Sequence, residues 1–245
     1  MRRLLIRPGG VGDFIVSLPA LEHLKGNYTE VWTAAQNVPL ARFADRARSI
    51  ASAGLDRVGV ATADDVISRL QQFDSIVSWY GTNRPDFRAE VAQLPFKFHE
   101  AVPPANGAVH AVDFFAAQVG LNPGAIPCIR YDSESGNYAA IHPFSGNPRK
   151  NWPIQNFREL ARRISRYMPV RWCCGPEEQL DECLRFTSLN ELGGWLAGAR
   201  LYIGNDSGIS HLAAATGIPV IAIFRNTDPL VWAPRGRNVR IAWLG

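Results

Sequence analysis

The chain has 245 residues, of which 47% are hydrophobic, 20% charged and 10% aromatic. This composition is typical of a globular protein and excludes a disordered, collagen-like or disulfide-scaffold chain. The length is sufficient for one large domain or two compact ones. The formal net charge is only +4, so we expect phosphate-bearing small molecules rather than nucleic acid as partners.

The cysteine pattern and the apolar runs predict the compartment. The four cysteines form no CxxC pair and have no metal-ligand spacing with histidine, so we expect buried thiols in a reducing compartment. They are Cys128, Cys173, Cys174 and Cys183. The apolar run near the amino terminus ends at Arg7 and is too short for a signal peptide. The longest apolar stretch, 212–224, is interrupted by Pro219 and cannot cross a bilayer. These features predict a cytoplasmic protein.

Short apolar runs alternate with helical patterns in the first half, which is typical of α/β proteins with parallel sheets. The predicted strands are residues 3–6, 30–33, 57–60 and 75–79, and the predicted helices are residues 14–24 and 111–119. Pro19 lies inside the first helix and should bend it, because proline removes one backbone donor.

A polar segment at residues 131–137 interrupts this alternation, and we interpret it as an interdomain linker. It divides the chain into domains 1–134 and 135–245. The later predicted strands are 138–142, 170–174, 201–204, 219–224 and 239–243, with helices at 154–167, 189–196 and 207–216. Two facing α/β units predict a cleft lined by loops at the carboxyl ends of both sheets, where a ligand should bind.

The strongest local signal runs from Tyr202 to His211, where a strand leads to Asp206 and a helix begins at Ser207 and Gly208. The first amides of a helix lack intrahelical partners and carry positive potential, which favours a phosphate. Gly208 would keep side-chain bulk away from that ligand. From spacing alone, Asp206 or Ser207 is equally well interpreted as a helix cap. His211 lies on the same side of the first turn and can donate to a phosphate or fix the loop.

A second strand–loop–helix segment spans residues 141–153 and offers several donors, namely Ser145, the Gly146 backbone, Arg149 and Lys150. The chain has 3 lysines against 23 arginines, so a lysine in this loop favours a phosphate contact. A solvated basic loop is the alternative.

A third loop, residues 9–13, lacks the third glycine of the dinucleotide-binding GxGxxG motif. This disfavours a nicotinamide-dependent oxidoreductase. Asp13 opens the following helix, and its position alone favours a helix cap. A carboxylate at this place is also stabilised as the anion, which suits a proton acceptor. The sequence contains no HExxH, Walker, GxSxG or DxD motif, so we expect neither a metal nor a cofactor.

Together these loops resemble glycosyltransferase family 9, the ADP-heptose:lipopolysaccharide heptosyltransferases. The resemblance is densest over residues 204–215, continues through 217–220 and 227–229, and recurs at 5–7, 12–13, 18–21, 110–113, 150–153 and 157. It implies a GT-B fold, that is, two Rossmann-like domains with parallel sheets facing a central cleft. It also implies that the first domain binds the acceptor and the second the donor.

The resemblance further implies an inverting, metal-independent glycosyltransferase. Such an enzyme moves a heptose-like sugar from an ADP-sugar, such as ADP-heptose, to a lipopolysaccharide-core or other surface-glycan acceptor. Asp13 matches the family's catalytic base. The matches on the donor side are Ser145, Gly146, Lys150, Ser207, Gly208 and Ile209 as phosphate contacts, Asp206 as a sugar-contacting or loop-ordering residue, His211 behind these contacts, and Glu178 at the ribose.

The acceptor side departs from the family pattern. Gly12 belongs to a matching loop, but Trp79, Tyr80 and Arg84 lie where many members carry an acidic-x-Gln motif. The two aromatic residues could stack on a sugar face, although aromatic residues at a strand end are more often core. In addition, residues 224–227 replace a Gly-Pro dipeptide, and the sequence ends at residues 243–245 without the family's terminal helix.

Two alternatives stay open: an inactive nucleotide-sugar-binding protein of the same fold, and a GT-B-like nucleotide-sugar epimerase. The expected partners are a nucleotide-sugar donor and a glycolipid or glycan acceptor, without nucleic acid and with at most peripheral membrane contact. The expected location is the cytoplasm, at the inner face of the inner membrane.

Overall fold

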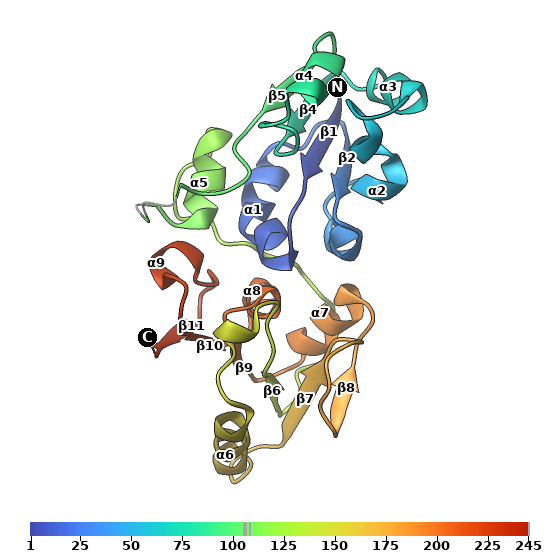
Figure 1. The fold of residues 1–245 in the computed structure, drawn as a ribbon. Coiled ribbons are helices and arrows are strands. Elements are labelled where there is room, and N and C mark those ends of the chain that lie inside the picture. The colour runs from blue at the N-terminus through green and yellow to red at the C-terminus, as the bar shows by residue number, and fades with distance from the viewer. Residues whose placement is uncertain (105–106, 108, 245) are drawn as a thin grey trace.

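The computed structural model describes residues 1–104, 107 and 109–244. Within them the strands form two sheets, shown one above the other in Figure 1. The N-terminal sheet has the order β3-β2-β1-β4-β5 and the C-terminal sheet the order β11-β10-β9-β6-β7-β8. Every strand pairing between described residues is parallel. Both orders are those of doubly wound α/β folds, which confirms the predicted fold class.

The N-terminal sheet is built around β1, whose residues Leu4, Leu5 and Ile6 are fully buried. A continuous apolar run is expected for a central parallel strand covered on both faces. The strands are β1 (Arg2–Arg7), β2 (Tyr28–Thr33), β3 (Arg46–Ser49), β4 (Ser75–Ser78) and β5 (Phe96–Phe98). The helices are α1 (Val11–His23), α2 (Ile50–Ala53), α3 (Asp64–Leu70), α4 (Pro85–Glu90) and α5 (Ala111–Gln118), with 3₁₀ turns η1 (Ala35–Leu40) and η2 (Leu55–Arg57).

The C-terminal sheet has β6 and β9 at its centre, and Ala139, Ala140 and Ile141 of β6 are fully buried. Its strands are β6 (Ala139–His142), β7 (Val170–Cys174), β8 (Cys183–Arg185), β9 (Leu201–Asn205), β10 (Val220–Phe224) and β11 (Val239–Trp243). Its helices are α6 (Ile154–Ile164), α7 (Leu189–Ala197), α8 (Gly208–Ala215) and α9 (Pro229–Trp232), with the 3₁₀ turn η3 (Pro148–Lys150).

The strand predicted at residues 57–60 is wrong. This segment contains the end of η2 and a turn in which Gly59 has φ +76°. Val58 is fully buried without belonging to either sheet. Three strands that the apolar pattern did not predict, β3, β5 and β8, each lie at the edge of a sheet. An edge strand needs no continuous apolar run, so its pattern is weaker.

The two halves share one apolar core although their sheets are separate. No helix or strand lies between Gln118 and Ala139, a stretch that the structure describes in full and that contains the predicted linker. A single cluster of buried side chains nevertheless extends from Phe14 on α1 to Leu212 on α8. In Figure 1, α1 and α8 meet between the two sheets. The carboxyl ends of the central strands are thereby held opposite each other.

The cysteines differ from the expectation of four buried thiols. Cys174 and Cys183 form a disulfide with their Cα atoms 6.0 Å apart, while Cys128 is an exposed thiol and Cys173 a buried one. The prediction failed because β7 and β8 are neighbours, which spacing in the sequence does not show. The disulfide closes the loop between these strands, residues 175–182. Among the described residues, no helix is long and apolar enough to span a bilayer.

Candidate functional site

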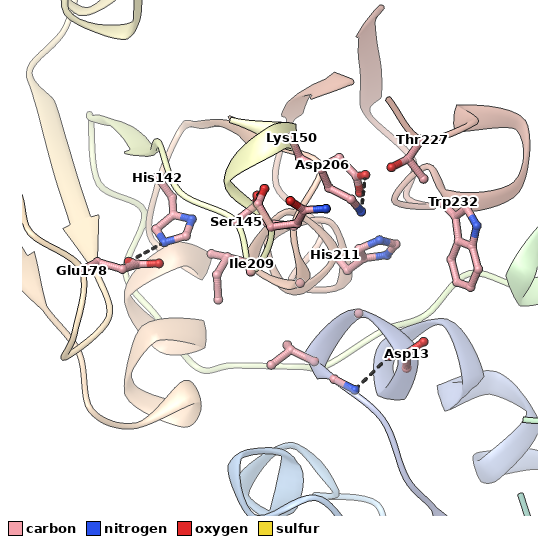
Figure 2. A pocket seen from close by; sticks show the side chains of 17 residues that line it. Asp13, His142, Ser145, Lys150, Glu178, Asp206, Ile209, His211, Thr227 and Trp232 are labelled. Atoms are coloured by element: carbon pink, nitrogen blue, oxygen red, sulfur yellow. Dashed lines mark hydrogen bonds and ion pairs between the residues drawn. The ribbon is translucent and has the colours of Figure 1, made fainter. Parts of the chain in front are cut away.

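A cavity of about 560 Å³ lies between the two halves, lined by residues from both. Its wall includes Asp13 and Gly12 from the first half together with every residue predicted for the donor side. The complete lining is Gly10, Val11, Gly12, Asp13, His142, Ser145, Gly146, Asn147, Lys150, Glu178, Asp206, Ser207, Gly208, Ile209, His211, Thr227 and Trp232. Figure 2 shows Asp13 facing the group formed by His211, Lys150 and Asp206.

Topology explains this convergence. Three of the lining segments follow β1, β6 and β9, the central strands of the two sheets. In each sheet the strand order changes direction beside these strands, and ligands of open α/β sheets bind at that position, outside the carboxyl ends. The loops therefore meet because each of them leaves its sheet at the carboxyl end of a strand beside which the strand order changes direction.

The amino-terminal ends of α1 and α8 abut through two glycines. A Cβ atom on Gly208 would lie 2.7 Å from Val11 Cβ and 3.0 Å from the Gly12 nitrogen. A Cβ on Gly12 would lie 3.3 Å from His211 Cδ2. Gly208 thus makes room for the other half of the protein, whereas the sequence had indicated room for a ligand. The contact directs the positive ends of two helix dipoles to one cavity.

Asp13 is the third residue of α1, and the structure shows the predicted capping contact together with a place in the cavity wall. Its Oδ2 atom accepts a hydrogen bond of 2.9 Å from the Gly10 amide, which is a capping contact. The same side chain lines the cavity and is partly exposed. Gly9 has φ +106°, and a Cβ there would lie 2.8 Å from Asp13 Cβ, so glycine is required for this loop to close on the carboxylate.

Lys150 forms an ion pair with Asp206, with Nζ 2.8 Å from Oδ2. The Asp206 side chain is only 6% exposed, whereas that of Lys150 is 29% exposed. Because both residues line the cavity, the ammonium group neutralises a buried carboxylate and still faces the site. An anion in the cavity would share Lys150 with Asp206.

His142, which the sequence analysis did not select, is paired with Glu178. Its Nε2 atom lies 2.9 Å from Glu178 Oε2, which also accepts a 2.6 Å hydrogen bond from the Gly175 amide. Burial alone would raise the pKa of Glu178, but the His142 and Gly175 contacts outweigh it and lower that pKa. Glu178 is thus an oriented carboxylate at one end of the cavity, on the loop closed by the Cys174–Cys183 disulfide.

His211 lines the cavity as a neutral imidazole. Burial lowers the pKa of His211 to about 4, against the opposing charges of Asp206 and Asp13. At neutral pH the imidazole therefore offers one donor and one acceptor. The His211 ring lies beside Gly12 and carries no charge for a phosphate.

The two donor-side loops are tied together by side chains that need no ligand. Asn205 is fully buried, and its side chain accepts from the Trp152 amide at 2.9 Å and donates to the Pro143 carbonyl at 2.6 Å. The Ser145 hydroxyl is already occupied, since its Oγ lies 2.7 Å from both the Asn147 carbonyl and Asn151 Oδ1. The Gly146 backbone stays open, because a Cβ atom at that position would meet no other atom within 4 Å.

The departure at residues 224–227 adds to this support. Arg225 donates to the Asn151 carbonyl at 2.7 Å, and Asn226 donates to the Arg149 carbonyl at 2.9 Å. Thr227 lines the cavity, as does Trp232 on α9. Neither residue was predicted. The signal that could have found them is their place after β10, the next strand of the sheet.

The acceptor-side prediction is wrong for Trp79. Its side chain is 1% exposed and stacks on His99 with ring centroids 5.3 Å apart, so it presents no face to a sugar. A large aromatic residue at the end of a central strand is buried by the neighbouring elements. Tyr80 and Arg84 are hydrogen-bonded to each other and lie outside the cavity lining, on the first half.

Lys150 and the helix ends make the cavity suitable for an anionic ligand. Over the described residues, no group of three or more His, Cys, Asp or Glu side chains is placed to hold a metal ion.

Two doubly wound sheets with a cavity between their carboxyl ends define a GT-B fold, and solved structures share it. E. coli heptosyltransferase WaaC with ADP is 19% identical, with a TM-score of 0.73 over 100% of this chain and 94% of that one. A glycosyl transferase of family 9 from Veillonella parvula is 16% identical, with a TM-score of 0.77 over 99% of this chain and 86% of that one.

The chain belongs to glycosyltransferase family 9 (heptosyltransferase), whose sequence profile matches residues 116–245. Lipopolysaccharide heptosyltransferase 3 of Escherichia coli K12 is 31% identical over an alignment of 126 residues, and the match covers 44% of this chain and 37% of that relative. The match thus spans just over a third of the length of that curated relative. These findings confirm the family resemblance of the sequence.

Proposed function

We propose that this protein is an inverting, metal-independent glycosyltransferase. It would move a heptose-like sugar from an ADP-sugar to a lipopolysaccharide-core or other surface-glycan acceptor. The observation that carries the proposal is that a carboxylate from the first half and an anion-suited wall from the second half line one cavity. The relatives named as lipopolysaccharide heptosyltransferases, and the WaaC structure that holds ADP, support the choice of donor and acceptor.

Asp13 is the base of the proposed reaction. Its Oδ2 atom is held by the Gly10 amide, which fixes the direction of the carboxylate. The carboxylate takes the proton of an acceptor hydroxyl while that oxygen forms a bond to the anomeric carbon. The bond from this carbon to the diphosphate oxygen breaks on the opposite face, and the electron pair leaves with ADP. Attack and departure on opposite faces invert the configuration.

The leaving diphosphate needs positive potential. Lys150 and the first amides of α8, at Gly208 and Ile209, supply it from the C-terminal wall. These protein cations and dipoles are the reason for proposing that no metal ion is needed. Glu178 is proposed to accept hydrogen bonds from the ribose hydroxyls, because its carboxylate is already oriented by His142.

The acceptor site is proposed on the first half, around Gly12 and Asp13, with Tyr80 and Arg84 at its outer part. The proposal includes a reaction at the cytoplasmic face of the inner membrane, because a lipopolysaccharide acceptor is lipid-linked.

The test is Asp13→Ala, assayed with ADP-heptose and deacylated lipopolysaccharide-core oligosaccharides. Loss of a general base lowers turnover by about 10²–10⁴-fold, while ADP affinity should stay unchanged because the donor wall is intact. Asp64→Ala is the matched control, since Asp64 also lies in the first turn of a helix but is exposed and outside the cavity.

Full turnover by Asp13→Ala would contradict the base assignment. Binding of ADP without transfer or donor hydrolysis by the wild type would instead favour the inactive binding protein. Release of an epimerised sugar without acceptor would favour the epimerase.

A further inference from the structure

Arg7, the last residue of β1, is a buried cation that the proposed reaction does not yet use. It is 2% exposed and is the largest charged side chain among the fully enclosed residues. Burial lowers the pKa of Arg7 to about 10, with the negative charge of Asp13 opposing this shift. The guanidinium is therefore still charged at neutral pH, and its burial must be compensated by specific contacts.

Two of the hydrogen bonds of Arg7 go to the backbone of the segment from Pro8 to Asp13. Its NH1 atom donates to the Pro8 carbonyl at 3.0 Å, and its NH2 atom donates to the Asp13 carbonyl at 2.9 Å. These two carbonyls stand at either end of the glycine loop. One planar guanidinium therefore bridges the loop from its first residue to its last.

Two further contacts fix the guanidinium itself. Its Nε atom donates to Ser17 Oγ at 3.0 Å, one turn further along α1, and its central carbon lies 4.4 Å from the ring centre of Phe115 on α5. NH1 also reaches the Ala101 carbonyl at 3.4 Å. None of the ion pairs found among the described residues includes Arg7. No ion pair within this part of the chain therefore neutralises the guanidinium, and its positive charge acts on the Asp13 carboxylate through space.

We propose that Arg7 is the positioning residue for Asp13. It holds both ends of the loop so that the carboxylate keeps its direction toward the acceptor hydroxyl, and it supplies a positive charge behind that carboxylate. This rests on the proposed function, in which Asp13 is the base. Five fixed donors in one plane suit this role, and lysine, with a single nitrogen, can replace only part of it.

The test compares Arg7→Met and Arg7→Lys with Arg3→Met. Arg3 is the matched control because it lies on the same strand and donates to the Leu24 carbonyl at the other end of α1, away from the cavity. The readouts are kcat and KM for transfer from ADP-heptose to lipopolysaccharide-core oligosaccharides, hydrolysis of ADP-heptose without acceptor, and ADP affinity.

We expect Arg7→Met to lower kcat by about 100-fold, the cost of displacing a reacting group by about 1 Å. KM for ADP-heptose and the affinity for ADP should not change, and Arg7→Lys should recover part of the lost kcat. Arg3→Met should turn over like the wild type. A general loss of folding would instead lower ADP binding together with kcat.

Ser17→Ala keeps the test decisive if Arg7→Met does not fold. It removes the Nε acceptor and the hydrogen bond of 2.8 Å from the Ser17 hydroxyl to the Phe14 carbonyl but leaves the guanidinium in place, and it should lower kcat by a smaller factor. Hydrogen exchange of residues 8–14 is the readout that needs no turnover, and it should be faster in the Arg7 variants than in Arg3→Met. Wild-type kcat in Arg7→Met, no recovery with lysine, or unchanged exchange would overturn the positioning role.

The Asp13→Asn variant separates this inference from the proposed function. If Asp13→Asn is inactive while Arg7→Met is fully active, only the positioning role of Arg7 fails. If Asp13→Asn keeps full turnover, the base assignment fails and the positioning role fails with it.

Discussion

The proposed donor-side wall and the proposed acceptor side of this protein differ in how their residues are positioned by the fold. On the proposed donor side, most of the selected residues lie just after the central strands β6 and β9, up to the first turn of α8. Glu178 lies in the loop between β7 and β8, and all of the selected residues reach one cavity. On the acceptor side, Trp79 is core, and Tyr80 and Arg84 contact each other instead. A loop at the carboxyl end of a central strand has its position fixed by topology. Topology does not fix the direction of an aromatic side chain at a strand end, because that direction depends on packing against neighbouring elements.

Trp79→Ala gives the largest expected effect and tests the core assignment. Removing a fully buried tryptophan should lower the free energy of unfolding by about 3–5 kcal/mol, measured by urea denaturation. Tyr80→Phe is the control, because it removes only the hydroxyl that contacts Arg84. A stable Trp79→Ala protein with a raised KM for the acceptor would restore the sugar-stacking interpretation. It would contradict the assignment of Trp79 to the core, on which the contrast between the two sides rests.

The pH dependence of stability tests the donor-side wall. Since burial lowers the pKa of folded His211 from 6.5 to about 4, the unfolded chain binds this proton more readily. The free energy of unfolding should therefore keep its full value above pH 6.5 and should decrease by about 3 kcal/mol as the pH falls toward 4. His211→Gln should remove that part of the pH profile. An identical profile in the variant would show that His211 is solvated.

Lys150→Met tests which cation meets the diphosphate. Loss of one charged hydrogen bond, about 1.5–3 kcal/mol, should weaken ADP binding by about 10- to 100-fold, measured by calorimetry. Arg149→Met is the matched control, since Arg149 is the neighbouring exposed residue of η3 and carries the same charge. Because Asp206 loses its partner, Lys150→Met/Asp206→Asn separates lost binding from a buried unpaired carboxylate. Equal effects of the two single variants would point to general electrostatics.

Gly208→Ala tests the contact between the halves and has the smallest expected effect. The added methyl group meets Val11 and the Gly12 backbone, so we expect a loss of about 1–3 kcal/mol in stability, seen by thermal denaturation. Gly146→Ala is the control, because a Cβ at that position would have no atom within 4 Å. If Gly208→Ala were as stable as Gly146→Ala, the two helix ends would not be in firm contact.

The sequence predicted the parallel α/β architecture and the donor-side loops because both depend on local patterns, an apolar run and the residues that follow it. It did not predict β3, β5 and β8, whose place at a sheet edge leaves little apolar signal. It also missed pairs formed by residues distant in the chain, such as His142 with Glu178 and Cys174 with Cys183. Nor does the sequence show that Gly208, besides lining the cavity, lies against Val11 and Gly12 of the other half of the molecule.

The glycine contact between α1 and α8 has a consequence for motion. Gly208 lies against Val11 and the Gly12 backbone, and the buried cluster from Phe14 to Leu212 crosses the same junction, so the two halves are held most firmly where α1 and α8 meet. A turn of one half about this junction would change distances across the cavity least at the junction itself and more at residues away from it, such as Glu178, which lies at the opposite side of Figure 2 from Asp13. The spacing between the Asp13 carboxylate and the first amides of α8 would then stay nearly constant during such a turn.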